Sequence, residues 1–234
     1  MLPALLWLLL VPLSVRAADL PTCERGCLVG EDGWTYEFKK ADVVVFAKAL
    51  YCESGRGIPG PEGETIAWTL VHRFYQTHEL WGSFAGFLDA YSQCVGKKWS
   101  SAGHRRTKRN ITERVDMVRS WSWEQIPVAG RWMADRFLAG LVPDRHPAWV
   151  HFLTCGYEQD RADGTIGPYR VGLRSGACNS YYAMRKTEAW TASTVVLVPA
   201  STELPPLLEA LDVLWRSEQL APWAVKEVPT CASR

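Results

Sequence analysis

Apolar residues recur at helical spacing in two neighbouring stretches of the chain, separated by a turn rich in glycine and proline. The first stretch predicts a helix over 41–54, and the second a helix over 62–77, where Ile66, Leu70 and Phe74 are spaced by four. The residues between them cannot continue a helix, because glycine and proline break it. The pattern therefore predicts two helices joined by a turn.

The rest of the pattern predicts a mainly helical protein with a few short strands. Further helices are expected over 81–91, 112–120, 124–140 and 203–219, and strand-like segments around 34–38, 149–154 and 181–184. Glycine and proline recur in 159–180, which predicts a loop, and 194–198 is too short to assign. The expected fold class is mainly α with a small β-region.

The N-terminal residues have the pattern of a secretory signal. Their apolar run from Leu2 to Leu13 is shorter than the ~20 residues that span a bilayer. Small residues at Val15 and Ala17 suit cleavage by signal peptidase. No Lys or Arg precedes the run, so an uncleaved anchor is the alternative. Cleavage predicts a secreted or periplasmic protein with no stable membrane insertion afterwards.

Length and composition indicate one globular domain with short appendages: 234 residues, of which 47% are hydrophobic and 22% charged. The expected segments are a signal peptide at 1–17, a lead at 18–40, a domain at 41–198, and a C-terminal helix and tail at 199–234 packed on it. The formal net charge is +1, and loss of Arg16 with the signal brings it to 0. A neutral chain argues against nucleic-acid binding. We expect a monomer.

Seven cysteines in an exported chain predict up to three disulfides. Cys23 and Cys27 predict a disulfide, or a crosslink to a cysteine of the tail, because no second ligand pair for zinc follows them. Cys155 with Cys178 would close the loop-rich stretch between them. Cys52 remains as the odd residue, and we interpret it as a buried free thiol.

A single acid, Glu53, lies at the end of the first predicted helix, between apolar residues and the glycine-rich turn. The helix dipole disfavours negative charge at this end. Its presence therefore favours a functional role over that of an exposed surface acid. Apolar surroundings raise the pKa of a carboxyl group, which lets it carry a proton near neutral pH. Glu53 is the candidate general acid.

The residues around Glu53 follow a recognisable motif. The chain reads ALYCESGRG at 49–57, GETIA at 63–67, HRF at 72–74 and YSQ at 91–93. This pattern resembles the SleB/CwlJ-type cell-wall hydrolases, and the order of elements over 137–182 resembles their second half more loosely. The chain departs from the family pattern at Ile58, where a second acid is usual, and at His72, where an Asn is usual.

The resemblance implies a lysozyme-like fold, a helical domain with a small β-region beside the cleft. It implies cleavage of peptidoglycan glycan strands at the β-1,4 bond between N-acetylmuramic acid and N-acetylglucosamine, with Glu53 as general acid and base. We expect no cofactor and no metal. The residues expected to bind substrate are Tyr51, Arg56, Gln93, Tyr181 and Tyr182. The alternatives are that Arg56 holds the turn, that Gln93 is a solvated loop amide, and that the two tyrosines are core residues. The pair Glu53-Ser54 also resembles the Glu-Ser pair of lytic transglycosylases.

Two reaction outcomes stay open. Hydrolysis needs a second carboxylate, for which Glu62 and Glu64 are candidates, although acids at a helix start are common for dipole reasons alone. If Glu53 works alone, the 6-hydroxyl of the substrate attacks and a 1,6-anhydromuramyl end forms. This lytic transglycosylase outcome is the one that the resemblance favours.

Other functions remain as alternatives. A Cys52 peptidase or amidase with His72 or His151 as base is disfavoured, because a thiolate is destabilised near a helix C-terminus. The five histidines show no metal-binding spacing. A lysozyme-like module that binds glycan without cleaving it is the non-enzyme alternative. The basic stretch 96–110 is either a solvated face or a contact for the anionic wall polymer.

Overall fold

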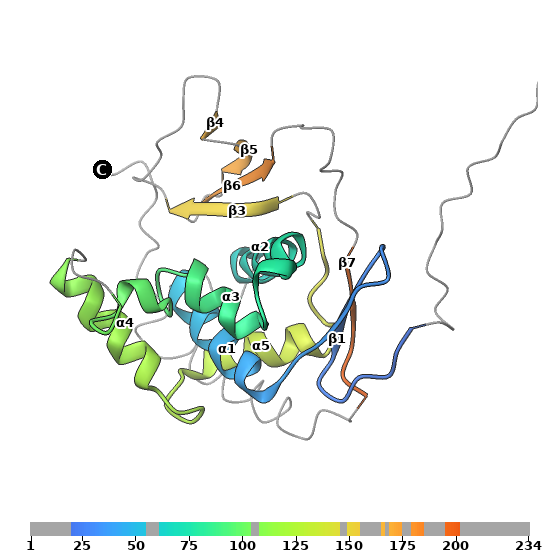
Figure 1. Ribbon diagram of the computed structural model, residues 1–234, viewed down its shortest axis with the longest axis horizontal. Helices are drawn as coiled ribbons and strands as arrows, with labels where there is room; N and C mark the ends of the chain where they lie inside the picture. Colours follow the sequence, from blue (N-terminus) through green and yellow to red (C-terminus); the bar gives the residue numbers. More distant parts are fainter. Residues whose placement is uncertain are drawn as a thin grey trace, which may run out of the picture.

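The computed structural model describes residues 20–54, 61–103, 108–145, 149–154, 165–166, 169–174, 179–184 and 195–201 (Figure 1). Its helices are α1 (Lys40–Ser54), α2 (Pro61–Thr77), α3 (Phe84–Tyr91), α4 (Arg109–Ser120) and α5 (Val128–Leu138), with short 3₁₀ turns η3 (His78–Leu80) and η4 (Lys97–Trp99). Two small antiparallel sheets accompany them. The predicted class, mainly α with some β structure, is confirmed at this level.

Aromatic rings fill the core between α1, α3 and α5. The ring of Phe46 meets those of Phe84 and Phe137 edge to face, with centroids 5.2 and 5.3 Å away, and all three are fully buried. Helices α1 and α5 approach closely at Gly130, where a Cβ would lie 2.7 Å from the carbonyl oxygen of Ala47. Truncating one of these phenylalanines to Ala would cost about 3–5 kcal/mol of stability. This packing fixes the direction of α1 and the place where it ends.

A buried carboxylate, Asp42, fixes the first turn of α1. Its Oδ2 accepts hydrogen bonds from the backbone N–H of Lys39 (2.8 Å) and the hydroxyl of Tyr36 (2.7 Å). Its Oδ1 accepts one from the backbone N–H of Ala85 (2.7 Å). The helix dipole also favours an acid at this end. Asp42 therefore ties α1 to the residues before it and to the start of α3.

The first sheet joins segments that are far apart in the sequence. Its order is β2 (Thr35–Glu37), β1 (Cys27–Gly30) and β7 (Val195–Val198), antiparallel throughout. Figure 1 shows β1 and β7 at one side of the helices. Leu28 and Phe38 are part of the main hydrophobic core. The expected lead at 18–40 therefore packs into the same core as the domain, and the unassigned segment 194–198 supplies an edge strand.

The second sheet lies against α2, and Figure 1 shows β3 directly above that helix. Its order is β3 (Trp149–Thr154), β6 (Asn179–Met184), β5 (Tyr169–Arg174) and β4 (Thr165–Ile166), antiparallel throughout. The strands expected at 149–154 and 181–184 are confirmed. The loop predicted over 159–180 is wrong, because it contains β4, β5 and the start of β6. Strands there form by pairing across the sheet, which outweighs the local glycine signal.

The predicted helices agree best in the first half of the chain, where 41–54 and 62–77 match α1 and α2 within a residue. Helix α3 begins later than predicted, because the Ser83 hydroxyl caps it by accepting a hydrogen bond from the Gly86 N–H (3.0 Å). The helix expected at 203–219 lies outside the described residues. In the part of the chain that is described, no helix is long and apolar enough to cross a membrane.

Candidate active site

Glu53 lies in the last turn of α1, where its carboxyl group meets the segment that follows α3. Its Oε1 accepts a hydrogen bond from the Ser92 hydroxyl (2.6 Å) and another from the backbone N–H of Gln93 (3.1 Å). Ser92 is buried, Glu53 is half-buried and Gln93 is exposed. The structure therefore brings Glu53 and Gln93 together, although Gln93 makes this contact through its backbone.

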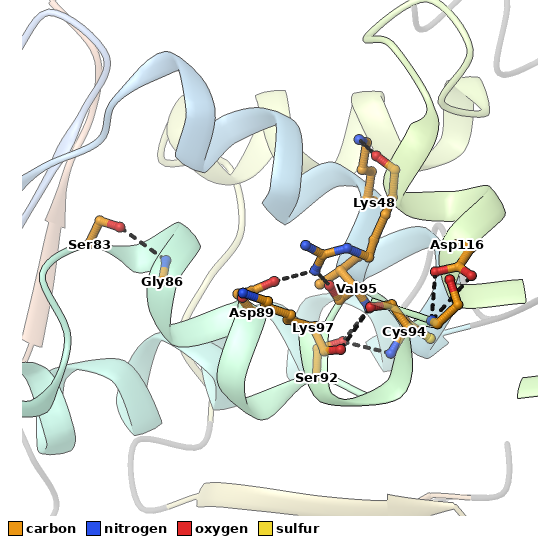
Figure 2. A network of polar contacts seen from close by, with 12 residues as sticks. Lys48, Ser83, Gly86, Asp89, Ser92, Cys94, Val95, Lys97 and Asp116 are labelled. Carbon is orange, nitrogen blue, oxygen red and sulfur yellow. Dashed lines mark hydrogen bonds and ion pairs between the residues drawn. The ribbon is translucent and has the colours of Figure 1, made fainter. Parts of the chain in front are cut away.

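The hydrogen bonds that Ser92 accepts determine the direction in which its hydroxyl proton points. Its Oγ accepts hydrogen bonds from the backbone N–H groups of Cys94 (3.0 Å) and Val95 (3.3 Å), which occupy both lone pairs. Figure 2 shows these two contacts as dashed lines from Ser92. The remaining proton is donated to Glu53, so Oε1 is an acceptor in this geometry. When Glu53 is neutral, its acidic proton is therefore on Oε2.

The environment of Glu53 favours the neutral acid. Burial raises the pKa of Glu53, and this effect exceeds the opposing hydrogen bonds from Ser92, Cys94 and Gln93 and the positive charge of Arg114. A raised pKa keeps part of the population protonated at a pH where an ordinary glutamate is ionised. The donors on Oε1 stabilise the anion after the proton has left. The site is therefore suited to give up a proton and take one back.

A disulfide joins Cys52, the residue before Glu53, to Cys94, the residue after Gln93. The two Cα atoms lie 5.7 Å apart, and the bond joins positions separated by 42 residues. The prediction of a free thiol at Cys52 is wrong, and the Cys52 nucleophile has no thiolate in this structure. The sequence contained a signal for this disulfide. Cys52 adjoins Glu53 and Cys94 adjoins Gln93, so the two cysteines must be close if Glu53 and Gln93 share a site. The disulfide fixes residues 92–95, here called the 92–95 turn, against the end of α1.

Arg119 on α4 holds the same turn from another side. Its guanidinium donates to the carboxylate of Asp89 on α3 and to the carbonyl oxygen of Val95. Its own carbonyl oxygen accepts a hydrogen bond from Nζ of Lys48 on α1 (2.9 Å). Figure 2 places Lys48, Asp89 and Val95 around this network. Contacts from three helices thus supplement the disulfide in positioning the turn.

The two candidates for a second carboxylate have other contacts. Glu62 is buried at the start of α2, and its Oε1 accepts a hydrogen bond from the Tyr181 hydroxyl (2.7 Å). Glu64 faces Arg145, with 3.8 Å between the carboxylate oxygen and the guanidinium nitrogen. The described contacts of Glu53 are to Ser92 and the backbone, and involve neither acid.

The remaining predicted substrate contacts are not gathered around Glu53. The ring of Tyr51 points toward Trp121, with centroids 5.8 Å apart. Tyr181 and Tyr182 are completely buried. Their burial agrees with the core position that was the alternative to lining a glycan groove. Arg56 lies outside the described residues.

A tyrosine–histidine pair adjoins the 92–95 turn. The Tyr91 hydroxyl lies 2.6 Å from Nδ1 of His151 on β3, and the Arg73 guanidinium lies over the Tyr91 ring, 5.6 Å from its centroid. Burial lowers the pKa of His151 to about 4, and the charge of Arg73 acts in the same direction. His151 is therefore neutral near pH 7, and its Nδ1 shares a hydrogen bond with the Tyr91 hydroxyl. Sequence reasoning missed this pair, which joins residues 60 positions apart.

His72 has a structural position. It is fully buried, its Nδ1–H donates to the carbonyl oxygen of Trp149 (3.0 Å), and its Nε2 lies 2.9 Å from Oδ2 of Asp144. Both ring nitrogens are occupied, so His72 links α2 to β3 and is not available as a base for Cys52. Within the described ranges, no group of three or more His, Cys, Asp and Glu side chains is arranged to hold a metal ion.

Comparison with protein-family models, with curated proteins and with solved structures finds no match to this chain. The resemblance to the SleB/CwlJ-type cell-wall hydrolases therefore rests on the residues around Glu53 and Gln93 and stays a prediction.

Proposed function

We propose that the protein is a peptidoglycan-cleaving glycosidase that acts on the β-1,4 bond between N-acetylmuramic acid and N-acetylglucosamine, with Glu53 as its general acid and base. The observation that carries the proposal is the setting of Glu53. Its pKa is raised by burial, and Oε1 is fixed by Ser92 and by the Gln93 N–H. The helical body with a small antiparallel sheet agrees with the lysozyme-like fold that the resemblance implies.

The chemistry needs one protonated carboxyl group. Oε2 of neutral Glu53 donates its proton to the glycosidic oxygen as the bond from C1 of the muramic acid to that oxygen breaks. The carboxylate left behind keeps the hydrogen bonds from Ser92 and Gln93 on Oε1. Glu53 then accepts the proton of the 6-hydroxyl as this oxygen bonds to C1, which gives a 1,6-anhydromuramyl end. General acid–base catalysis of this kind contributes about 10²–10⁴ in rate.

A single-acid reaction is proposed rather than hydrolysis, because the Glu53-Ser54 pair resembles that of lytic transglycosylases. Hydrolysis would need a second carboxylate placed several ångströms from Glu53. The two candidates each have another partner: the Tyr181 hydroxyl donates to Glu62, and Arg145 lies beside Glu64. The lytic transglycosylase outcome is therefore the proposed one.

Export also belongs to the proposal. The Cys23–Cys27 and Cys52–Cys94 disulfides suit an oxidising compartment. The expected signal peptide at 1–17 lies outside the described residues, as does Cys231, and Cys23 and Cys27 pair with each other rather than with the tail. We place the mature protein in the periplasm or outside the cell, where peptidoglycan is found.

The test is the clearing of purified peptidoglycan by the full chain and by Glu53→Gln, which keeps the size of the side chain and loses its acid. We expect the variant to lose at least about 100-fold of the activity, the contribution of a general acid. Glu79→Gln, which changes an exposed acid on η3, serves as the control and should retain activity. If both wild type and Glu53→Gln bind the wall and release nothing, the protein is a binding module.

A further inference from the structure

A shallow depression of about 410 Å³, open to solvent and here called the groove, lies beside the 92–95 turn. It is lined by Asp89, Ala90, Lys97, Lys98, Ala102 and Gly103. Its size and openness suit a flexible peptide segment lying on the surface. Figure 2 shows Lys97 close to Ser92 and Asp89 at this position.

The backbone of the groove is joined directly to the turn that holds Glu53. The Gly96 N–H donates to the carbonyl oxygen of Ser92 (3.0 Å), and a Cβ at Gly96 would lie 2.2 Å from that oxygen. At the other end, a Cβ at Gly103 would lie 1.7 Å from the carbonyl oxygen of Lys97. Only glycine allows these two close approaches. The residues that line the groove are therefore packed closely against the backbone of the turn that holds Glu53.

Positive charge in the groove is not neutralised by the acid that lines it. Asp89 is engaged by the guanidinium of Arg119. Lys97 and Lys98 are exposed, and neither has an ion pair within the described ranges, although Nζ of Lys98 lies over the Trp99 ring, 5.4 Å from its centroid. The two ammonium groups are thus available to an anion from outside.

A further cation acts on the acid. Arg114 is exposed on α4, close enough for its charge to act on Glu53. An anionic substituent on a glycan bound at Glu53 would be attracted by Arg114 as well as by the lysines beside the 92–95 turn. In peptidoglycan, that substituent is the peptide on the lactyl group of the muramic acid, which carries carboxylates.

We propose that the groove lined by Lys97 and Lys98 binds the carboxylates of the peptide stem, so that the protein acts on peptide-bearing glycan rather than on bare glycan strands. This inference rests on the proposed function and names the form of the substrate. Exposed ammonium–carboxylate contacts are individually weak, so the groove selects among glycans rather than providing most of the affinity.

The experiment measures binding in the Glu53→Gln background, so that cleavage does not consume the ligand. The ligands are peptidoglycan freed of secondary wall polymers, and the same glycan after an amidase has removed its peptide stems. The double variant Lys97→Gln/Lys98→Gln is compared with Lys39→Gln/Lys40→Gln, which removes two exposed lysines at the start of α1. The two double variants have the same net charge.

We expect the groove variant to bind peptide-bearing glycan about five-fold more weakly than its parent, as two exposed contacts allow, and to bind stem-free glycan like its parent. The control pair should match the parent on both ligands, and salt should reduce the preference for stems. Equal binding by both double variants, an equal loss on stem-free glycan, or no glycan binding at all would overturn the inference. Cleavage by wild type is assayed separately, so the groove can fail while Glu53 catalysis stands.

Discussion

The Ser92 hydroxyl lies 2.6 Å from Oε1 of Glu53 and donates to it, because the backbone N–H groups of Cys94 and Val95 occupy its lone pairs. This relationship assigns different roles to the two carboxyl oxygens. Oε1 is held as an acceptor, and Oε2 carries the proton that leaves. Ser92 is therefore a positioning residue for the proposed acid.

Ser92→Ala should change both the rate and the pH dependence. Loss of this hydrogen bond raises the pKa of Glu53 further, because the Ser92 donor opposes the effect of burial. The reaction needs the protonated acid, so the alkaline limb of the pH–rate profile should move to higher pH. The maximal rate should fall about tenfold, part of what a general acid contributes.

Ser92→Thr keeps the hydroxyl and serves as the matched control, with a profile close to that of wild type. A Ser92→Ala profile that stays in place while the rate falls would mean that Ser92 acts only on the fold. Product release from peptidoglycan across a pH series is the measurement.

Glu53→Gln should stabilise the protein at neutral pH. Burial raises the pKa of Glu53 above its ordinary value of 4.5. The contribution of Glu53 to the free energy of unfolding is therefore fully present below its pKa in the unfolded chain. It is lost as the pH rises through its pKa in the folded protein. Urea unfolding should show the variant more stable than wild type near pH 7, with a difference that disappears toward pH 4.

Asp135→Asn is a second variant, away from Glu53, for which we expect the same direction of change in stability with pH. Burial raises the pKa of Asp135 to about 6, against the opposing charge of Arg131. Its variant should gain stability relative to wild type as the pH rises through about 6. If Glu53→Gln instead lost stability at neutral pH, the carboxylate would be the preferred native form and the account of its environment would be wrong.

Peptidoglycan cleavage should depend more on the Cys52–Cys94 disulfide, next to Glu53, than on the Cys23–Cys27 disulfide. Replacing Cys52 and Cys94 by serine frees the 92–95 turn and removes a crosslink over 42 positions, at a cost of about 2–4 kcal/mol of stability. The Cys23 and Cys27 pair spans four positions, and its double serine variant is the control. We expect the first variant alone to lose most peptidoglycan cleavage while remaining folded by circular dichroism. Equal activities of the two variants would show that the turn needs no crosslink.

Tyr181→Phe tests the core position of the paired tyrosines. Removing the hydroxyl leaves the buried Glu62 without this donor, which should cost about 1–3 kcal/mol of unfolding free energy. Because Tyr181 is completely buried, affinity for peptidoglycan should stay unchanged. A binding defect without a loss of stability would restore the substrate-contact role predicted from the sequence. Urea unfolding and a pull-down with purified wall distinguish the two.

Local pattern was sufficient for α1, α2 and the position of Glu53, because apolar spacing and a glycine-rich turn are encoded within a few residues. It was not sufficient for the partners of Glu53. The bond to Ser92 joins residues 39 positions apart, and the Cys52–Cys94 disulfide joins residues 42 apart. Such contacts depend on how α3 packs on α1, which no local periodicity reports.

The sheet shows the same limit. Tyr169–Arg174 becomes β5 because it pairs with β6, although the surrounding glycines indicated a loop. Tyr181 and Tyr182 were predicted to line a glycan groove, with a core position as the alternative, and the structure buries both, with Tyr181 bonded to Glu62 of α2. The aromatic pair alone could not distinguish a core position from a binding surface.

The most direct test of the central claim is mass spectrometry of the soluble products released from purified peptidoglycan, with Glu53→Gln as the control. The account predicts 1,6-anhydromuramyl products from wild type and their loss in the variant. Reducing muramyl ends from wild type would contradict the single-acid reaction and require a second carboxylate. Anhydromuramyl products that persist in Glu53→Gln would contradict the role of Glu53 itself.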